Sequence, residues 1–456
     1  MEIQEIVSNQ RAYFNTGKTI DIEFRLKKLR QLREAIMRHE DDINAALKAD
    51  LGKGNQESYM CEVGLTLSEL RHQFAHVRGW AKPQRVHADL ANFHSKCFTI
   101  AEPYGSVLIM SPWNYPFMLT MEPLIGAIAA GNCCVVKPSA YSPATCDIIK
   151  AIIKEVFDPG HVDCVLGGRA ENTELLEQRW DYIFFTGSPT VGKLVMEKAS
   201  RYLTPISLEL GGKSPCIITK DANIKIAASR LAFGKFLNVG QTCVAPDYVL
   251  VDALVKDQFI DELKRQVVAM YGADAFSNPN YGRIVNQKHY DRVMGLINPE
   301  KVVYGGRGKA ETLQIEPTIM TDITADDAVM GEEIFGPLCP VITYTTIKEA
   351  EDFIKEREKP LALYLFSNNK TTQQRFLRYV PFGGGCINDT IVHLATSNMG
   401  FGGVGNSGMG SYHGKRSFET FSHTKSILKK YNWIDLPLRN QPYEDWKLKA
   451  IKLFLH

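Results

Sequence analysis

The sequence predicts an α/β protein with two domains, each built on a parallel sheet that helices cover. Short apolar runs alternate with segments of helical periodicity between residues 106 and 201, as in strands joined by crossover helices. The alternation starts again after Gly211 and Gly212. Hydrophobic residues make up 45% and charged residues 23% of the 456 residues, which is typical of a folded globular chain.

The first 80 residues are predicted to be mostly helical, because apolar residues from Phe24 to Ile36 recur near the helical period. The glycine-rich segment 400–411 is predicted to be an ordered loop or crossover. The strands expected from apolar runs lie at 106–110, 133–137, 163–166, 182–186, 248–251, 340–344 and 361–366. The helices expected between and after them include 144–157, 191–201, 222–237 and 256–271.

The charge balance and the cysteines exclude several classes of protein. The 53 Lys and Arg residues and the 51 Asp and Glu residues leave a net charge of +2, so bulk electrostatics do not favour a nucleic-acid partner. None of the ten cysteines forms a C-x-x-C pair, so no metal site is expected. The N-terminal residues do not resemble a secretory signal. Ten cysteines in a chain of this length then suggest reduced thiols and a cytoplasmic location.

The longest apolar stretch, residues 116–136, has nearly the length of a membrane span. Glu122 and Pro123 lie inside it, so a buried helix followed by a buried strand is the better interpretation, and no transmembrane segment is expected. The last eleven residues are basic and apolar but too short to span a membrane. They are expected to dock on the protein, although contact with a membrane surface or a partner is the alternative.

Residues 185–193, FTGSPTVGK, place glycines and a serine between a strand and a helix. The first turn of a helix exposes backbone N–H groups and the positive end of the helix dipole, which favour an anion such as a pyrophosphate. Only two glycines are present, so the motif is not the full dinucleotide fingerprint. Taken alone, the segment also fits an ordinary strand-to-helix turn.

Two residues have the chemistry of a nucleophile and a base. Cys243, in GQTCVAP, is predicted to lie in a loop before a strand, where its thiolate could attack an electrophile. Glu209, in LELGGKSP, follows an apolar run and could act as a general base on water. Each has a simpler interpretation, because most cysteines are small packing residues and most glutamates are surface acids.

Two more polar residues follow predicted strands. Asn114, in SPWNYPF, could donate a hydrogen bond to a developing oxyanion, or it could simply shape a turn beside the prolines. Lys137 ends a strand before Pro138 and could reach a ribose or phosphate, or it could be a solvated lysine.

Together these segments, with EEIFGP at 332–337, resemble the aldehyde dehydrogenase superfamily over essentially the whole chain. The spacing of 34 residues from Glu209 to Cys243 is specific to that resemblance, and the short N-terminus is similar to the class-3 group. The resemblance implies a Rossmann-like cofactor domain, an α/β catalytic domain and a small β-flap for oligomerisation. It implies cofactor-binding at 1–81 and 106–208, catalysis at 209–418, and a flap with a C-terminal tail at 82–105 and 419–456.

The resemblance also implies a reaction. Cys243 attacks an aldehyde, the Asn114 amide and the Cys243 backbone N–H hold the oxyanion, and Glu209 activates the water that hydrolyses the thioester. NAD or NADP accepts the hydride. The cofactor-binding residues that it implies are Trp113, Lys137, Gly187, Ser188, Val191, Leu210, Gly211, Glu333 and Phe335.

One departure bears on the cofactor. Many family members have a glutamate three residues after this lysine, which repels a 2′-phosphate, whereas this chain has Ala140. NADP is therefore expected to be accepted. Medium-chain aliphatic or aromatic aldehydes are expected as substrates. The residues implied to line the substrate pocket are Tyr115, Leu119, Leu237, Phe401 and His413.

The remaining expectations concern assembly and rival activities. A cytoplasmic homodimer is expected, with a small aldehyde as its binding partner. Three alternatives stay open: transfer of the thioester to coenzyme A, esterase activity alone, and a catalytically silent protein on this fold. Retention of Glu209 favours hydrolysis over coenzyme A transfer, and the set of Asn114, Glu209 and Cys243 argues against a silent protein.

Overall fold

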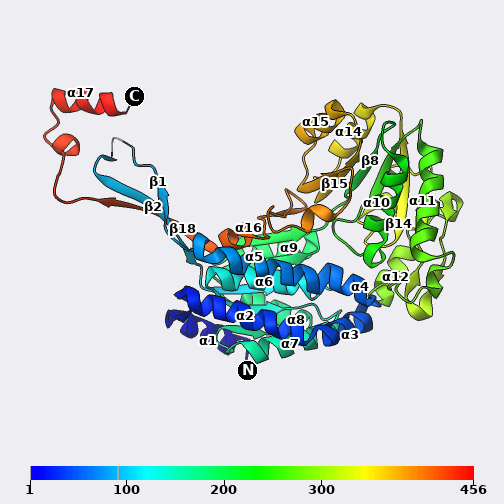
Figure 1. The fold of residues 1–456 in the computed structure, drawn as a ribbon, viewed down its shortest axis with the longest axis horizontal. Coiled ribbons are helices and arrows are strands. Elements are labelled where there is room, and N and C mark those ends of the chain that lie inside the picture. Colours follow the sequence, from blue (N-terminus) through cyan, green and yellow to red (C-terminus); the bar gives the residue numbers. More distant parts are fainter. Residues whose placement is uncertain (1, 90–91, 456) are drawn as a thin grey trace.

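The computed structural model describes residues 2–89 and 92–455. Two α/β bodies lie side by side, and a long hairpin-like arm projects from the first of them (Figure 1). The first body contains the N-terminal helices, and the second contains most of the chain between residues 215 and 387.

The first body is built on a six-stranded sheet in the order β17-β7-β6-β3-β4-β5. All its pairs are parallel except β17 with β7. The chain enters at the central strand β3, proceeds outwards through β4 and β5, and then returns to the other side of β3 for β6 and β7. The strands are β3 (Ser106–Met110), β4 (Cys133–Lys137), β5 (Val162–Cys164), β6 (Tyr182–Gly187), β7 (Ile206–Leu210) and β17 (Gly408–Met409).

Helices cover both faces of this sheet, which explains why β3 and β4 are buried along their whole length. The helix α6 is buried at every position, and the buried strand β4 follows it. The apolar stretch 116–136 is thus a buried helix followed by a buried strand, as predicted. The helices of this body are α1 (Ile3–Asn15), α2 (Ile22–Arg38), α3 (Glu40–Leu51), α4 (Asn55–Ser58), α5 (Gly64–Trp80), α6 (Met118–Ala130), α7 (Pro143–Val156), α8 (Arg169–Glu177), α9 (Pro189–Ser200) and α16 (Lys415–Thr420).

The second body contains a seven-stranded sheet in the order β10-β13-β14-β9-β8-β15-β16, parallel except for β10 with β13. Its strands are β8 (Pro215–Ile218), β9 (Tyr248–Asp252), β10 (Val302–Tyr304), β13 (Thr318–Met320), β14 (Leu338–Tyr344), β15 (Ala362–Phe366) and β16 (Gly384–Ile387). Its helices are α10 (Ile224–Phe236), α11 (Lys256–Tyr271), α12 (Gln287–Met294), α13 (Ala328–Gly331), α14 (Ile347–Lys355) and α15 (Lys370–Tyr379). A two-stranded ribbon pairs β11 (Gly308–Lys309) with β12 (Gln314–Ile315).

The arm is a three-stranded antiparallel sheet in the order β1-β2-β18. It consists of β1 (Gln84–Val86), β2 (Ser95–Pro103) and β18 (Ser422–Lys430), and the helix α17 (Asp445–Phe454) follows at its outer end (Figure 1). Among the described residues, no helix combines the length and apolar character that a membrane crossing needs. The α/β architecture with two parallel-sheet bodies and a small β-flap is as expected.

Candidate active site

The strand order of the first sheet creates a crevice beside β3. The connections from β3 and β6 leave in opposite directions, and ligands of open α/β sheets bind at the carboxyl ends of strands where the order reverses in this way. Trp113 and Asn114 follow β3 there, Lys137 ends β4, and Ser188 follows β6. The topology thus brings four of the predicted residues to one edge of the sheet.

Cys243 is held on a loop between α10 and β9. Before it, Asn238 and Val239 have φ of 52° and 55°, a left-handed conformation that costs about 1 kcal/mol or more for each residue. Side-chain hydrogen bonds hold this turn, because Asn238 Nδ2 donates to the Gln241 carbonyl at 3.1 Å and Gln241 Nε2 donates to the Arg283 carbonyl at 3.0 Å. The irregular backbone presents a partly exposed thiol.

Burial and the nearby carboxyl groups both favour the protonated thiol of Cys243. Burial, followed by the nearby carboxyl groups of Glu333 and Glu209, raises the pKa of Cys243 to about 12. The backbone N–H groups of Cys243 and Val244 act in the opposite direction. Neutralising either carboxyl group should therefore make the thiolate easier to form.

Glu209 lies in β7 and is only 3% exposed, so it is not the surface acid of the simpler interpretation. Neither carboxyl oxygen has a hydrogen-bond partner within the described part of the chain. Burial alone raises the pKa of Glu209 well above its usual value. A carboxylate without competing partners is free to take a proton from a water molecule.

Asn114 is 2% exposed and faces the loop that carries Cys243. Its Nδ2 donates to the Gln241 carbonyl at 3.0 Å, two residues before the thiol. A primary amide has two N–H groups, so one remains for an oxygen atom beside Cys243. The side chain therefore bonds to the loop of Cys243 and does not only shape a turn beside the prolines.

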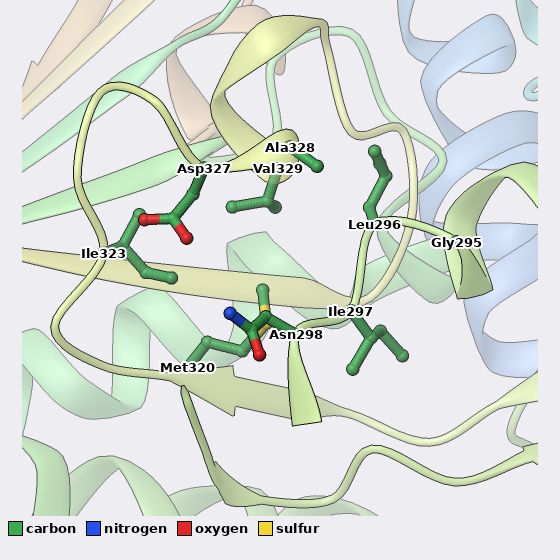
Figure 2. Close-up of a pocket in the computed structure, with 9 residues that line it drawn as sticks. All are labelled: Gly295, Leu296, Ile297, Asn298, Met320, Ile323, Asp327, Ala328 and Val329. Carbon is green, nitrogen blue, oxygen red and sulfur yellow. The ribbon is translucent and has the colours of Figure 1, made fainter. Parts of the chain in front are cut away.

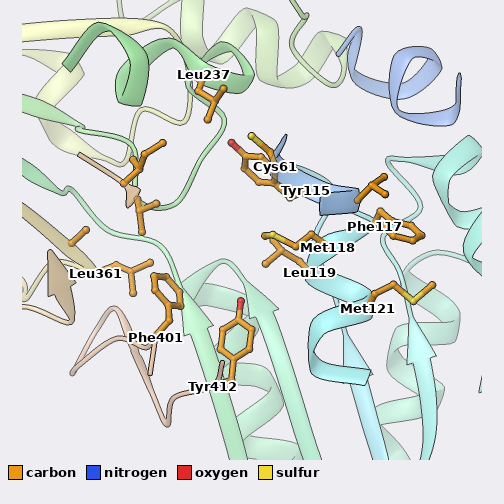
Figure 3. Close-up of a cluster of buried hydrophobic side chains, with 14 of the residues drawn as sticks. Cys61, Tyr115, Phe117, Met118, Leu119, Met121, Leu237, Leu361, Phe401 and Tyr412 are labelled. Carbon is orange, nitrogen blue, oxygen red and sulfur yellow. The ribbon is translucent and has the colours of Figure 1, made fainter. Parts of the chain in front are cut away.

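A cavity of about 150 Å³ opens beside the thiol. All five predicted pocket residues and Cys243 line it, whereas Asn114 and Glu209 are not among its lining residues. Figure 3 shows Tyr115, Met118 and Leu119 on one side, with Leu237, Phe401 and Tyr412 opposite. The full lining is Met60, Cys61, Leu65, Tyr115, Met118, Leu119, Phe233, Leu237, Thr242, Cys243, Val244, Ile391, Val392, Leu394, Ala395, Phe401, Tyr412 and His413. The wall is therefore predominantly aliphatic and aromatic.

His413 is the basic residue in this wall. Its Nε2 lies 3.1 Å from the Glu122 carboxylate, and both side chains are buried. Burial lowers the pKa of His413, but the carboxylates of Glu122 and Glu69 outweigh that effect and raise it. The carboxylate of Glu122, on α6, thus balances the positive charge of the His413 imidazolium. The imidazole ring stacks on Phe401, with ring centroids 5.5 Å apart.

Lys137 is 3% exposed and is not a solvated lysine. Its ammonium group donates to the carbonyl groups of Pro138 at 3.0 Å and Gly167 at 2.7 Å. An ammonium group has three hydrogens, so one remains for a ligand oxygen. Ala140, three residues later, is exposed and leaves this position without an acid.

The start of α9 fits the pyrophosphate of a dinucleotide. Ser188 caps the helix through a bond from the Val191 N–H, and Pro189 occupies the first turn. Gly187 must lack a side chain, because a Cβ there would lie 2.6 Å from the Phe185 ring. A Cβ at Gly192 would lie 2.8 Å from a terminal methyl group of Leu210, which would have to shift. The helix N-terminus thus offers backbone donors to an anion.

Glu333 and Phe335 lie opposite the end of β7. A Cβ at Gly211 would be 1.9 Å from Glu333 Oε2, so only glycine lets this carboxylate approach the backbone. Phe335 has φ of 49° and meets the Trp113 ring edge-on at 5.3 Å. Burial, followed by the charge of Asp247, raises the pKa of Glu333 to about 8.

Sequence reasoning missed the residues that hold the Glu333 segment. Lys213 donates to Asp247, to the Val329 carbonyl at 2.9 Å and to the Glu332 carbonyl at 2.7 Å. The other Asp247 oxygen accepts from the Ile334 N–H at 2.9 Å. Lys213 stands in the LELGGKSP motif, and Asp247 directly follows GQTCVAP. The sequence therefore shows both charges, but it does not show that they hold residues 329–334, through contacts between positions 87 or more residues apart.

We predict that Glu333→Gln accelerates alkylation of Cys243 by iodoacetamide above pH 8. Glu333 is ionised there, and its charge opposes the thiolate; below pH 7 it is already neutral, so the variant should match the parent. The expected gain at pH 9 is about threefold to tenfold, since one pKa unit changes the thiolate fraction tenfold. Mass spectrometry of the Cys243 peptide measures it. Glu358→Gln, an exposed carboxyl group, is the control, and equal rates at pH 9 would refute the charge effect.

A second, smaller cavity of about 110 Å³ lies in the second body between α12, β13 and α13 (Figure 2). Its carboxylate, Asp327, accepts two bonds from Lys301 at 2.8 Å and 2.7 Å and another from the Thr324 N–H. Lys301 lowers the pKa of Asp327 below its usual value. These bonds hold the carboxylate of Asp327 within its own loop, so the described lining of this cavity offers no free reactive group, unlike the cavity that contains Cys243.

The comparisons with known proteins agree with this geometry. Residues 1–427 match the model of the aldehyde dehydrogenase family. The 4,4'-diaponeurosporen-aldehyde dehydrogenase of Staphylococcus aureus is 47% identical over 454 residues, covering 99% of both chains. The "aldehyde dehydrogenase, dimeric NADP-preferring" of Canis lupus familiaris is 46% identical over 94% of both.

Solved structures give the same result. A substrate-bound S. aureus AldH superposes with a TM-score of 0.98 at 46% identity, over the full length of both chains. GapN of Methanocaldococcus jannaschii, a glyceraldehyde-3-phosphate dehydrogenase complexed with NADP, gives 0.83 at 26% identity over 94% of both chains.

The chain belongs to the aldehyde dehydrogenase family. It is an oxidoreductase that acts on aldehydes with NAD or NADP.

Proposed function

We propose that the protein oxidises medium-chain aliphatic or aromatic aldehydes to carboxylic acids through a covalent intermediate on Cys243. The observation that carries this proposal is the apolar cavity of about 150 Å³ that contains the thiol. Its aliphatic and aromatic wall suits an aldehyde tail that carries no charge. His413, neutralised by Glu122, provides no free cation to clamp a second carboxylate.

In this mechanism the Cys243 thiol first loses its proton to solvent water. The thiolate sulfur then bonds to the aldehyde carbon as the carbonyl π bond opens, and the carbonyl oxygen becomes an oxyanion. The free N–H of the Asn114 amide and the Cys243 backbone N–H donate to that oxygen. When bound, NAD(P)+ accepts the hydride that leaves the same carbon. The resulting thioester is cleaved by a water molecule whose proton passes to Glu209, and the acid and the free thiol result.

The cofactor-binding roles belong to the same proposal. Lys137 holds a hydroxyl of the adenosine ribose with its remaining hydrogen, and Trp113 and Ser188 contact the pyrophosphate. Gly187 and Val191 line the adenine side of the start of α9. Glu333 binds the nicotinamide ribose, and Phe335, Leu210 and Gly211 pack around it. The edge-on contact of Trp113 with Phe335 and the close approach of Glu333 to Gly211 support this placement.

Ala140→Glu is predicted to shift the protein towards NAD. The position is exposed, so the side chain is tolerated, and its charge would face the 2′-phosphate beside Lys137. The ratio of kcat/KM for NADP over that for NAD should fall by about tenfold or more, equivalent to ~1.4 kcal/mol. Ala140→Gln, of equal size without the charge, should keep the parent's ratio. An unchanged ratio in Ala140→Glu would count against the charge argument.

We also propose the domain limits, assembly and location expected from the sequence. The cofactor-binding domain comprises 1–81 with 106–208, the catalytic domain 209–418, and the flap with the C-terminal tail 82–105 with 419–456. The strand β17, at 408–409, pairs with β7 of the first sheet, next to the boundary between residues 208 and 209. A homodimer is supported by the canine relative, which is named as dimeric, and by the projecting sheet β1-β2-β18. A cytoplasmic location is supported by ten unpaired cysteines.

A panel of aldehydes assayed with NAD and with NADP separately tests the proposal. The panel contains straight-chain aldehydes of increasing length, benzaldehyde, a carboxylate-bearing semialdehyde and 4,4'-diaponeurosporen-aldehyde, and absorbance of the reduced cofactor is followed. We expect uncharged apolar aldehydes to be preferred and the acid to form without coenzyme A. Preference for the semialdehyde, or acid formation that requires coenzyme A, would overturn the proposal. Ester cleavage without any cofactor reduction would indicate an esterase.

A further inference from the structure

A fully buried ion pair lies behind the loop that carries Asn114. Lys53 Nζ donates to Glu62 Oε1 at 2.5 Å, and neither side chain is exposed. Both residues come from the N-terminal helical region: Lys53 precedes α4, and Glu62 lies in a π-helical segment, Tyr59–Val63, between α4 and α5. π-helical turns are rare and often occur at functional sites.

Lys53 holds the backbone of Asn114 directly. Its ammonium group donates to the Asn114 carbonyl at 3.0 Å and lies 4.0 Å from the centroid of the Tyr115 ring. The same carbonyl accepts from Asn238 Nδ2 at 2.8 Å. Two donors thus fix the plane of the peptide that follows Asn114, and one of them belongs to the loop that leads to Cys243.

Glu62 holds the other end of this loop. Its Oε2 accepts from the Phe117 N–H at 2.9 Å and the Met118 N–H at 3.2 Å, where α6 begins. A carboxylate at a helix N-terminus is favoured by the helix dipole. The ion pair therefore ties residues 114 and 117–118 to one another through two charged side chains that water does not reach.

We propose that Lys53 and Glu62 are positioning residues that aim the Asn114 amide at the oxyanion. The proposal rests on the proposed function, in which Asn114 donates to that oxyanion. An amide displaced by about 1 Å loses much of its effect on a transition state. The pair acts through the Asn114 backbone, and neither residue is among those that line the cavity beside Cys243.

Removing one partner would leave the other charge buried and unpaired, which destabilises a fold by itself. The test variant is therefore Lys53→Met with Glu62→Gln, which removes both charges and retains an amide oxygen for the Phe117 and Met118 N–H groups. The double variant should fold but unfold at a somewhat lower temperature, because the buried carboxyl group of Glu57 also loses the nearby charge of Lys53. Its kcat should fall about tenfold to a hundredfold, while KM for the cofactor stays within about twofold.

A double-mutant cycle with Asn114→Ala provides the decisive readout. Asn114→Ala alone should lower kcat/KM by about 10²- to 10³-fold. In that background the Lys53→Met, Glu62→Gln change should have less than about a threefold effect, because the amide that it positions is gone. Multiplicative losses would show that the pair acts elsewhere and would overturn the inference, as would full activity of the Lys53→Met, Glu62→Gln variant. Full activity of Asn114→Ala would overturn the proposed role of Asn114 and the inference with it.

Two further measurements separate positioning from folding. Lys355→Met with Glu351→Gln removes the ion pairs of Glu351 with Lys355 and Arg375, away from the cavity, and should leave kcat unchanged. Where the Lys53→Met, Glu62→Gln variant does not fold, Lys53→Arg enters the same cycle, because it keeps both charges and changes only the position of the donor to the Asn114 carbonyl. A loss of kcat in Lys53→Arg that persists in the Asn114→Ala background contradicts the proposal.

Discussion

Cys243→Ala should abolish aldehyde oxidation, lowering kcat/KM by at least about 10³-fold, because the reaction loses the sulfur to which the substrate bonds. The side chain is partly exposed in the cavity, so its truncation should leave the unfolding temperature nearly unchanged. Initial rates of NAD(P) reduction with a good aldehyde measure the loss.

Cys97→Ser is the matched control for Cys243→Ala. Cys97 is also partly exposed, but it lies in β2 of the projecting sheet, away from the cavity. The Cys97→Ser variant should keep the parental rate. Residual oxidation in Cys243→Ala within tenfold of the parent would show that another group forms the bond to the aldehyde.

Glu209→Gln should separate the two halves of the reaction. Thiol attack and hydride loss remain, so the first turnover should produce one reduced cofactor per active site. Hydrolysis of the thioester loses its base, and the steady-state rate should fall by about 10²- to 10⁴-fold. Stopped-flow absorbance should show this burst followed by a slow phase.

The pH dependence of the slow phase checks the role of Glu209 as a base. Burial raises the pKa of Glu209, so the parent's hydrolysis rate should increase with pH as the carboxyl group loses its proton. Glu209→Gln should lack this limb of the profile. Glu262→Gln, a buried acid in α11, should keep the parental profile. The same rising limb in Glu209→Gln would assign the base to another residue.

The helices and strands that surround the site were predictable because each has a local pattern. The expected helix at 256–271 coincides with α11, and the expected strands at 106–110 and 133–137 coincide with β3 and β4. The expected strand at 163–166 begins one residue earlier and ends two residues earlier, at Val162–Cys164. Buried parallel strands read as continuous apolar runs, which is why their limits follow from sequence so closely.

The convergence of the site was predictable only in part. Strand ends place Asn114 and Ser188 at one edge of a parallel sheet, and the resemblance supplied Glu333 and His413. No local pattern indicates that β17 completes the first sheet beside Glu209, since the two strands are about 200 residues apart. The left-handed turn at Asn238 and Val239 has no glycine in those two positions to mark it.

The supporting charges were not predictable because each depends on a distant partner. Lys53 and Glu62 read as ordinary surface charges in a helical region, yet both are fully buried against the Asn114 loop. Lys213 and Asp247 stand in or beside recognised motifs, but their contacts with residues 329–334 appear only in three dimensions. Such residues hold the reactive groups without having chemistry of their own.

The central claim is that the aldehyde becomes a thioester on Cys243. Peptide mass spectrometry of the Glu209→Gln variant, trapped during one turnover, tests this claim most directly. The variant is mixed with hexanal and NADP, quenched in acid within one turnover, and digested for peptide mass spectrometry. The mechanism predicts one hexanoyl group per chain, on the Cys243 peptide, in proportion to the reduced cofactor formed. Reduced cofactor without that acyl group, or an acyl group on another residue, would contradict it.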